Sequence, residues 1–264
     1  MSIKRTMRIL IITENDEFYL PLALQAFIET NNYHILGVIS AKNPLLKGKF
    51  HTAKKFGKIF GLLPVVQKGI SLLKAKTFDL FSVLNRTGRF WSIEKVCQHY
   101  NLEYSFCENI NDSGFVAHLS SLNLDLIACI SPTQIFRDQL INTPKYGCIN
   151  IHTASLPNYR GLYPTYWAMA SGEKEVGICI HYIESGIDTG KILLRCAEKI
   201  PANTSMDYML KKTKVTGGEL LSQACKLIGE GKIAPEYAQG EGSYYSFPTK
   251  ESYTVFKSNG YTLW

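Results

Sequence analysis

Three polar residues in the middle of the chain have types and spacing that could support an acyl transfer. Asn150 and His152 stand two residues apart at the end of the apolar run 147–151, and Asp188 lies between glycines after a second apolar run, 176–183. If the first run is a strand, its period of two places the amide and the imidazole on one face. A nearby carboxylate could orient the imidazole and favour its charged form. These groups could stabilise the oxyanion of a tetrahedral intermediate and move a proton.

Each of these residues also has an ordinary structural explanation. An asparagine at a strand edge is typical of a turn, and a histidine in an apolar strand is usually a hydrogen-bonded core residue. Their combination with Asp188 and with the loop LPNYRG (156–161) favours the catalytic interpretation. His181, in the second apolar run, is expected to support the site structurally. The aromatic residues Tyr163, Tyr166 and Trp167 have helical spacing and are expected to pack rather than to stack on a ligand.

The segments that must position these residues alternate between strand and helix patterns. Apolar runs predict strands at 8–13, 33–40, 102–108, 124–130, 147–151, 176–183 and 190–200, and apolar residues at helical spacing predict helices at 19–29, 92–100, 113–122, 163–171 and 205–229. A strand–helix–strand opening indicates a parallel sheet with right-handed crossovers. The expected fold is α/β and Rossmann-like, a mostly parallel sheet flanked by helices. Its loop 131–136 follows a strand's carboxyl end, where such sheets bind ligands.

A basic segment at about 42–78 interrupts this alternation. No acidic residue occurs between Glu29 and Asp79, whereas nine lysines in this window contribute a charge of +9. Because the net charge of the whole chain is +7, the rest of the chain has a net charge of about −2. The nine lysines are Lys42, Lys47, Lys49, Lys54, Lys55, Lys58, Lys68, Lys74 and Lys76. Apolar stripes at 56, 59, 60 and 63 and at 66, 70 and 73 predict two amphipathic helices separated by Pro64. Their basic face could be merely solvated, dock weakly on anionic lipid or a lipid-linked acceptor, or contact an anionic acceptor.

The whole chain sets broader limits. Its 264 residues, 45% hydrophobic, can bury a sizeable core, and we expect a catalytic domain at 1–200 with a small C-terminal appendage, a helix and tail at 201–264, packed on it. Seven cysteines without C-x-x-C spacing predict free buried thiols and a reducing cytoplasm. We expect no signal peptide and no membrane-spanning segment. Because the basic charge is local, general nucleic-acid binding is not expected.

The motifs themselves resemble those of the folate-dependent formyltransferase family, which includes the methionyl-tRNA and amino-sugar enzymes. The family pattern N-x-H-x-S-L-L-P-x-Y-R-G, then G-x-T-x-H and D-x-G-x-I, corresponds here to NIHTASLPNYRG, GICIH and DTGKI. The three blocks occur in the same order, within a matched region of about 124–194. Ala154, Ser155 and Cys179 depart from the pattern beside the catalytic groups.

The resemblance implies an enzyme that moves the formyl group of 10-formyltetrahydrofolate to a primary amine without a metal. Asn150, His152 and Asp188 would be catalytic. Residues implied to bind the folate are Gln134, Ile135, Phe136, Gly186 and Ile187, and residues implied to face the acceptor are Arg160, Gly161 and Tyr163.

The acceptor is the least determined part of this hypothesis. The Tyr159-Arg160-Gly161 sequence counts against the glycinamide ribonucleotide enzymes. The short stretch after Pro201 argues against the tRNA-binding barrel, and the immediate first strand argues against the hydrolases. A small anionic acceptor, namely a nucleotide-linked amino sugar, is therefore expected. A homodimer is one of the states that the sequence allows. A methionyl-tRNA formyltransferase, a hydrolase and a folate-binding protein without turnover stay as alternatives.

Overall fold

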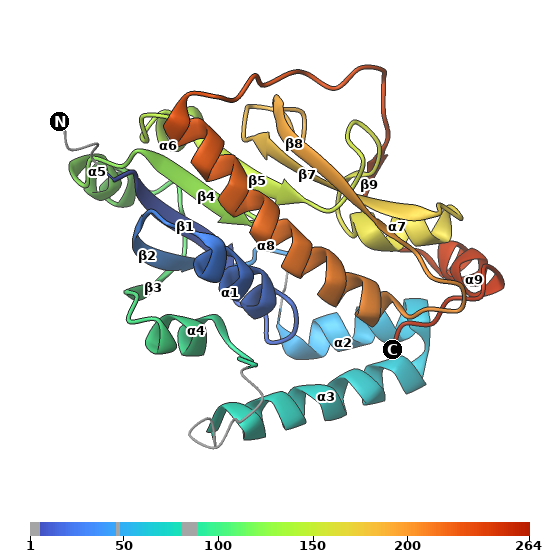
Figure 1. Cartoon of the computed structure of the whole chain (residues 1–264). Helices are drawn as coiled ribbons and strands as arrows, with labels where there is room; N and C mark the ends of the chain where they lie inside the picture. The colour runs from blue at the N-terminus through green and yellow to red at the C-terminus, as the bar shows by residue number, and fades with distance from the viewer. Residues whose placement is uncertain (1–5, 46–47, 81–88) are drawn as a thin grey trace.

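The computed structural model describes residues 6–45, 48–80 and 89–264, so Lys47 of the basic segment lies outside it. Seven strands form one sheet in the order β3-β2-β1-β4-β5-β7-β8 (Figure 1). They are β1 (Arg8–Glu14), β2 (His34–Ala41), β3 (Tyr104–Cys107), β4 (Leu126–Ile130), β5 (Cys148–His152), β7 (Glu175–Tyr182) and β8 (Ile192–Lys199). The first five pair in parallel, and β7 and β8 are antiparallel to their neighbours. The predicted mostly parallel α/β sheet is confirmed.

Helices cover both faces of the sheet, and the sequence of β1 shows why. Ile9 and Ile11 enter one core together with α1 (Leu20–Thr30), α4 (Ile93–His99) and α8 (Met206–Glu230). Leu10 and Ile12 enter a second core with α5 (Ser113–Ser121) and α6 (Asp138–Ile141). A strand buried on both faces is mostly apolar rather than alternating, as β4 also is. β5 is buried along its whole length but carries the polar residues Asn150 and His152.

The long helix α8 crosses the front of the sheet beside α1 (Figure 1). Its first turn is capped by Ser205, whose side chain accepts the Tyr208 N–H, and it ends at Gly231 in the left-handed conformation. Leu221, Ala224 and Cys225 are buried in the main core, so the helix completes the layer over β5 and β7. The segment after Pro201 is thus packed on the sheet, whereas the domain boundary at residue 200 stays a prediction.

The basic segment forms α2 (Lys49–Phe60) and α3 (Leu62–Leu80), but the break between them is not where the sequence placed it. Gly61, with a φ of +90°, ends α2, and Pro64 lies inside the first turn of α3, where a missing N–H costs nothing. The first predicted stripe is only partly buried: Phe60 lies in a core cluster, whereas Leu63 is 68% exposed. The second stripe faces solvent.

The tail adds an element that the sequence did not indicate. In this element Tyr244–Tyr245 (β9) pairs in parallel with Arg160–Gly161 (β6). The sequence does not indicate it because a strand of two residues leaves no periodic signal. The tail also forms the short helix α9 (Lys250–Ser258), and its Phe256 is buried against Tyr166 of α7 (Pro164–Ala170), with the two rings stacked at 5.1 Å. The tail therefore covers the loop that carries the motif.

Two further expectations concern the cysteines and membrane-spanning helices. All seven cysteines are free, and all except Cys196 are buried. Among the helices in the described ranges, none has the length and apolarity that crossing a bilayer requires.

The α1–α8 contact predicts a stability difference between two glycines. A Cβ on Gly218 would stand 2.3 Å from the Ala23 carbonyl oxygen, whereas one on Gly69 of α3 would meet nothing within 4 Å. Gly218→Ala should lower the free energy of unfolding by about 1–3 kcal/mol through overpacking. Gly69→Ala should raise it by up to about 1 kcal/mol through helix propensity. Urea unfolding measures both, and equal stabilities would contradict the assigned packing.

Candidate active site

The residues predicted to be catalytic come together on two paired strands. Asn150 and His152 lie on β5, and Asn150 is the direct partner of His181 on the antiparallel strand β7. Asn150 and His152 are 7% and 5% exposed. The Asn150 Nδ2 lies 3.3 Å from His181 Nε2. The two imidazole rings are 6.2 Å apart and nearly perpendicular.

Asp188 reaches this pair from the turn between β7 and β8. Its Oδ1 lies 3.6 Å from His152 Nδ1 and 3.6 Å from His181 Nε2. Its Oδ2 accepts the backbone N–H of Gly161 at 2.8 Å. Asp188 has a φ of 52°, a left-handed conformation that Asp tolerates better than most residues. One carboxylate therefore lies beside both histidines and accepts a hydrogen bond from the loop LPNYRG (156–161), here called the motif loop.

Hydrogen-bond partners fix where the two imidazoles carry protons. His181 Nδ1 is 2.8 Å from the Tyr182 carbonyl oxygen, which can only accept, so this nitrogen donates. Burial lowers the pKa of His181, against the opposing effect of Asp188. The neutral ring then accepts the Asn150 amide at Nε2. His152 Nε2 donates to the Tyr159 carbonyl oxygen at 2.9 Å, which leaves its Nδ1 facing the carboxylate.

The Asn150 side chain has unused hydrogen-bonding capacity in this buried place. Its Oδ1 is buried and has no partner. One Nδ2 proton is directed to His181, so a second N–H also stays available. A buried polar atom without a partner is costly and rare in folded proteins, so it points to a ligand that completes the bonding.

The loop LPNYRG is shaped by the tail. The Tyr159 N–H donates to Ser243 Oγ at 2.9 Å, and the Arg160 N–H donates to the Ser243 carbonyl oxygen at 2.9 Å. Gly161 has a φ of +92°, and a Cβ there would lie 2.3 Å from the Tyr245 carbonyl oxygen. Only glycine fits this position, which is what delivers its N–H to Asp188.

The residues implied to bind the folate occupy two loops, after β4 and after β7. Ile135 and Ile187 are 66% and 44% exposed and offer apolar surface. The Gln134 side chain instead joins loops, donating to the carbonyl oxygens of Lys42 and Glu108, and Phe136 is buried in the second core. A Cβ on Gly186 would lie 2.2 Å from Thr189 Oγ1. Folate binding by these residues stays a prediction.

A buried polar cluster that sequence reasoning missed lies where the strand order reverses, at the carboxyl ends of β1 and β4. Glu14 accepts from Thr133 Oγ1 at 3.2 Å and from the Asn43 amide, and burial raises its pKa to about 7. Lys214 of α8 is 8% exposed and donates to Ser131 Oγ at 2.6 Å. Open α/β sheets bind ligands at this crevice. The available signal was a carboxylate directly after the first apolar run.

Another carboxylate occupies the start of α1. Asp16 Oδ1 accepts the N–H groups of Phe18 and Leu20 at 2.9 and 3.0 Å and also that of Tyr19. Free N–H groups at a helix start are a ready site for anions. Here the protein's own side chain takes that site.

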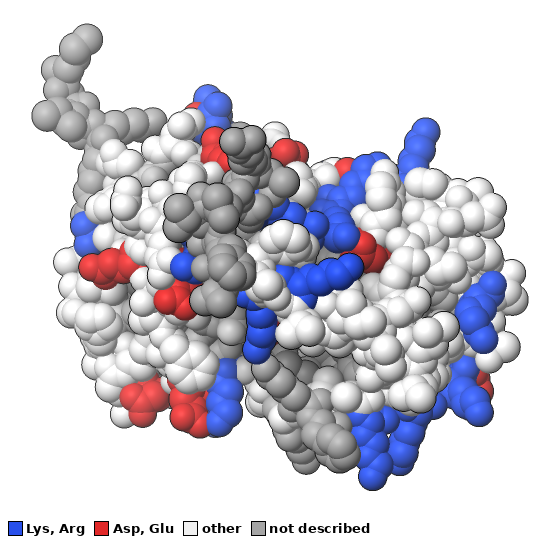
Figure 2. Space-filling model, turned by 90° about the horizontal axis from the view of Figure 1, so that it is seen from below, with Lys and Arg blue, Asp and Glu red and all other residues white. Residues whose placement is uncertain are grey.

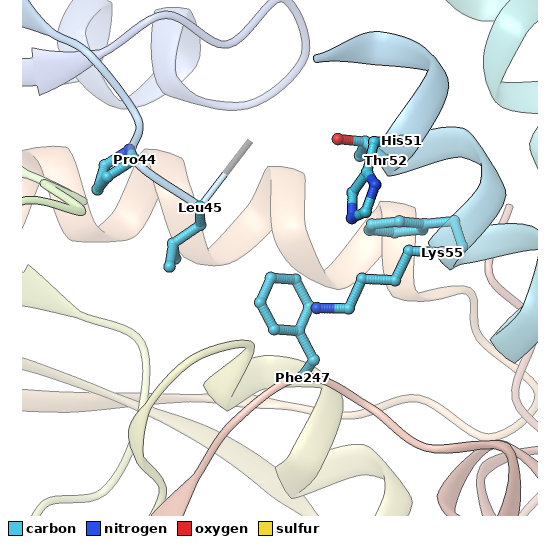
Figure 3. A pocket seen from close by; sticks show the side chains of 7 residues that line it. Pro44, Leu45, His51, Thr52, Lys55 and Phe247 are labelled. Carbon is cyan, nitrogen blue, oxygen red and sulfur yellow. The ribbon is translucent and has the colours of Figure 1, made fainter. Parts of the chain in front are cut away.

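A cavity of about 290 Å³ lies between α2 and the tail, beyond the carboxyl end of β2 (Figure 3). Its walls are formed by Pro44, Leu45, His51, Thr52, Lys55, Phe56 and Phe247. The Lys55 Nζ stands 3.1 Å above the centre of the Phe247 ring. Figure 3 shows His51 and Lys55 extending from the helix toward the tail.

Tyr163, predicted to face the acceptor, connects this cavity to the motif loop. Its ring lies 6.3 Å from Phe56 and 5.4 Å from Phe247. Burial raises its pKa, with a further contribution from the charge of Glu14. Tyr166 is fully buried and Trp167 stacks on Tyr245 at 4.5 Å, so both pack as predicted. Among the described residues, no group of three or more His, Cys, Asp or Glu side chains is placed so that it could hold a metal ion.

Known sequences resemble this chain over the region of the motifs. Residues 81–225, more than half of the chain, match the family model for formyl transferases. The chain is 35% identical over 136 residues to the methionyl-tRNA formyltransferase of Caldanaerobacter subterraneus, a match that covers 52% of the chain and 44% of that protein. It is 37% identical over 141 residues to that of Pelotomaculum thermopropionicum, covering 53% and 45%. Each match thus spans less than half of the relative.

Solved structures share the fold over nearly the whole chain. A sugar N-formyltransferase from a Shewanella species has a TM-score of 0.59 at 16% identity and covers 96% of this chain and 87% of its own. A glycinamide ribonucleotide transformylase from Symbiobacterium toebii has a TM-score of 0.58 at 16% identity, covering 90% and 92%. At such identities the likeness concerns the fold alone. Because the family model spans more than half of the sequence, the chain belongs to the formyl transferase family.

Proposed function

We propose that the chain is an N-formyltransferase, which moves the formyl group of 10-formyltetrahydrofolate to the primary amine of a small acceptor such as a nucleotide-linked amino sugar. The observation that carries this proposal is the buried, unpartnered oxygen of Asn150 beside two imidazoles that each lie 3.6 Å from one carboxylate. Family membership names the group that is transferred. The site itself supplies the donors and acceptors that an acyl transfer from a carbonyl carbon to an amine requires.

Each catalytic side chain has a distinct task in this proposal. The donor supplies a formyl carbonyl, on whose oxygen negative charge develops as the amine attacks. The free N–H of Asn150 stabilises that oxygen, and one such donor is typically worth about a hundred- to thousand-fold in rate. Asp188 holds His152 in place and, with it, takes up the proton that the amine loses. When the tetrahedral intermediate collapses, the bond between the formyl carbon and N10 of the carrier breaks and N10 receives that proton, so tetrahydrofolate leaves. His181 positions the Asn150 amide through its neutral Nε2.

The folate is proposed to lie between the loops after β4 and after β7. Ile135 and Ile187 offer it exposed apolar surface, and backbone groups of Gln134, Phe136 and Gly186 offer hydrogen bonds. An aromatic ring system gains from such apolar walls with a few polar contacts. The fit depends on the two loops, not on any charged side chain.

The acceptor is proposed to enter from the opposite side, through the cavity that Tyr163 borders. His51 and Lys55 offer positive or donor groups for an anionic substituent, and Phe56 and Phe247 offer ring surfaces. Because Asp16 fills the start of α1, a phosphate would bind beside Lys55 rather than at that helix. Arg160 and Gly161 shape the loop between cavity and carboxylate.

A methionyl-tRNA acceptor is the second candidate, favoured by the sequence relatives, which are named as methionyl-tRNA formyltransferases. The small amine is preferred because a cavity of about 290 Å³ suits a sugar-sized group and the basic charge is confined to one segment. A cytoplasmic location is part of the proposal, since seven free thiols suit a reducing compartment.

The proposed activity can be tested on the purified protein. Incubated with 10-formyltetrahydrofolate, it should formylate an amino-sugar nucleotide and release tetrahydrofolate in equal amount, as followed by mass spectrometry and absorbance. Methionyl-tRNA is offered in a parallel reaction. Formylation of the tRNA alone would select the second candidate, and formate release without any formylated amine would indicate a hydrolase.

Replacing one carboxylate oxygen at the site tests its chemistry. Asp188→Asn keeps an acceptor for the Gly161 N–H but removes the charge, so kcat should fall by about a hundred- to ten-thousand-fold while the melting temperature changes little. Asp138→Asn, at an exposed carboxylate of α6, is the matched control and should keep full activity. Near-normal turnover of the Asp188 variant would remove the role assigned to this residue.

The half-buried Glu14 predicts a dependence of stability on pH. Its pKa is about 7 in the fold and 4.5 in the unfolded chain, so the folded state binds the extra proton between these values and stability falls as pH rises through that window. Glu14→Gln should remove this loss and be more stable than the parent by up to about 3 kcal/mol above pH 7. Near pH 4.5 the variant and the parent should have nearly equal free energies of unfolding.

Denaturant unfolding across that window measures the difference. Glu241→Gln, at an exposed glutamate of the tail, serves as the control and should follow the parent at every pH. A Glu14 variant with the same pH profile as the parent would show that the folded protein does not suppress ionisation of this carboxyl.

A further inference from the structure

The outer face of α3 is an apolar stripe that nothing in the described structure covers. Six of the sixteen exposed large apolar side chains in the described residues lie on this one helix. Five of them, here called the α3 stripe, are Leu62 (76% exposed), Leu63 (68%), Val66 (47%), Ile70 (52%) and Leu73 (69%). At about 100° per residue they fall along one side of the helix. Scattered exposed apolar residues are ordinary, but a contiguous row of them marks a contact surface.

The opposite face of α3 accounts for how the helix is attached. Ala75 is fully buried, and Val65 and Leu72 are half-buried on the same side. Lys68 also turns inward, with its Nζ 3.2 Å above the Phe18 ring and 4.7 Å from the Trp264 ring. The helix is therefore already packed on the protein by one side. The stripe is not a core face that has lost its cover.

The exposed charged side chains described on α2 and α3 are lysines. Lys74 and Lys76 are exposed and flank it on its two sides, and Lys54 and Lys58 are exposed on the neighbouring α2. The sequence has no acidic residue between Glu29 and Asp79. Figure 2, which views the molecule from the side on which α3 lies, shows Lys and Arg side chains amid uncharged surface, with Asp and Glu side chains at several other places on the same face. An apolar stripe bordered by lysines is the pattern of helices that lie in a membrane interface.

A second copy of the chain fits this surface poorly. In a symmetric dimer the same patch meets itself, so lysines of both copies would border the interface with no carboxylate from α2 or from the start of α3 to pair with them. An anionic lipid surface offers acyl chains to the stripe and negative head groups to the lysines at once. Charge complementarity therefore selects the bilayer as the partner.

We propose that α3 docks the protein on the surface of a bilayer that contains anionic lipids, with the α3 stripe inserted among the head groups and the flanking lysines bound to them. The helix lies in the plane of the surface. Binding rests on two contributions, apolar burial and attraction by the lysines, and therefore needs both. This docking does not depend on which amine the active site uses.

Vesicle sedimentation tests the proposal with the full chain. The protein should sediment with vesicles of phosphatidylcholine mixed with phosphatidylglycerol, at least about tenfold more strongly than with phosphatidylcholine alone, and added salt should weaken the binding. The variant Val66→Ser/Ile70→Ser/Leu73→Ser should lose binding. Lys74→Gln/Lys76→Gln should lose roughly thirtyfold, at about 1 kcal/mol for each lysine.

Matched variants elsewhere on the surface control for general effects. Phe106→Ser/Val255→Ser removes exposed apolar groups and Lys226→Gln/Lys250→Gln removes exposed charges, and both should bind vesicles as the parent does. All variants should keep the parent's melting temperature, because every substituted side chain is exposed.

Three results would overturn the proposal. These are no sedimentation with anionic vesicles, equal binding to both vesicle types, or a dimer in solution that the α3 stripe variant dissociates while vesicle binding is absent. The last result would assign the stripe to a second copy of the chain.

Discussion

One carboxylate holds the proposed catalytic apparatus together. Asp188 lies in a turn between two strands, yet it reaches the imidazoles of His152 and His181 at equal distances and also accepts the backbone N–H of Gly161. It thereby joins β5, β7 and the motif loop. The alternative to this arrangement is a buried charge without partners, which is strongly unfavourable, so the three segments stabilise one another's positions. The buried Asn150 amide is aligned by the same set of contacts, through His181.

The two sides of this apparatus differ in construction. The side toward the loops after β4 and β7 is made by the sheet's own connections, with exposed Ile135 and Ile187. The side toward the cavity is made by segments distant in sequence, α2 and the tail, which meet through Lys55, Phe56, Phe247 and Tyr163. Such added segments can change an acceptor pocket while the sheet and its polar residues stay fixed. The basic segment thus contributes in two places. Its helix α2 lines the cavity, and its helix α3 carries the exposed apolar stripe.

Much of the fold could be predicted because its signals are local. Buried parallel strands such as β1 and β4 contain continuous apolar runs, and α8 requires apolar residues at helical spacing over many turns. The junction of α2 and α3 was misplaced because a proline is tolerated in a first turn, while a glycine with positive φ ends a helix. The pairing of β6 with β9 joins two residues across a long stretch of chain, and so short a strand has no pattern.

By itself, the sequence determined the chemical groups of the site and the strand that carries two of them, since spacing by two fixes Asn150 and His152 on one face. Only the tertiary structure decided that Asp188 meets both histidines, that Glu14 and Lys214 are buried at the reversal of strand order, and that the α3 stripe faces outward. The physical reason is that a hydrogen bond between distant residues, or the burial of a side chain, depends on which segments of the chain pack against each other. The spacing of apolar residues along a helix shows that one of its faces is apolar. Whether the rest of the protein covers that face depends on how the neighbouring elements pack.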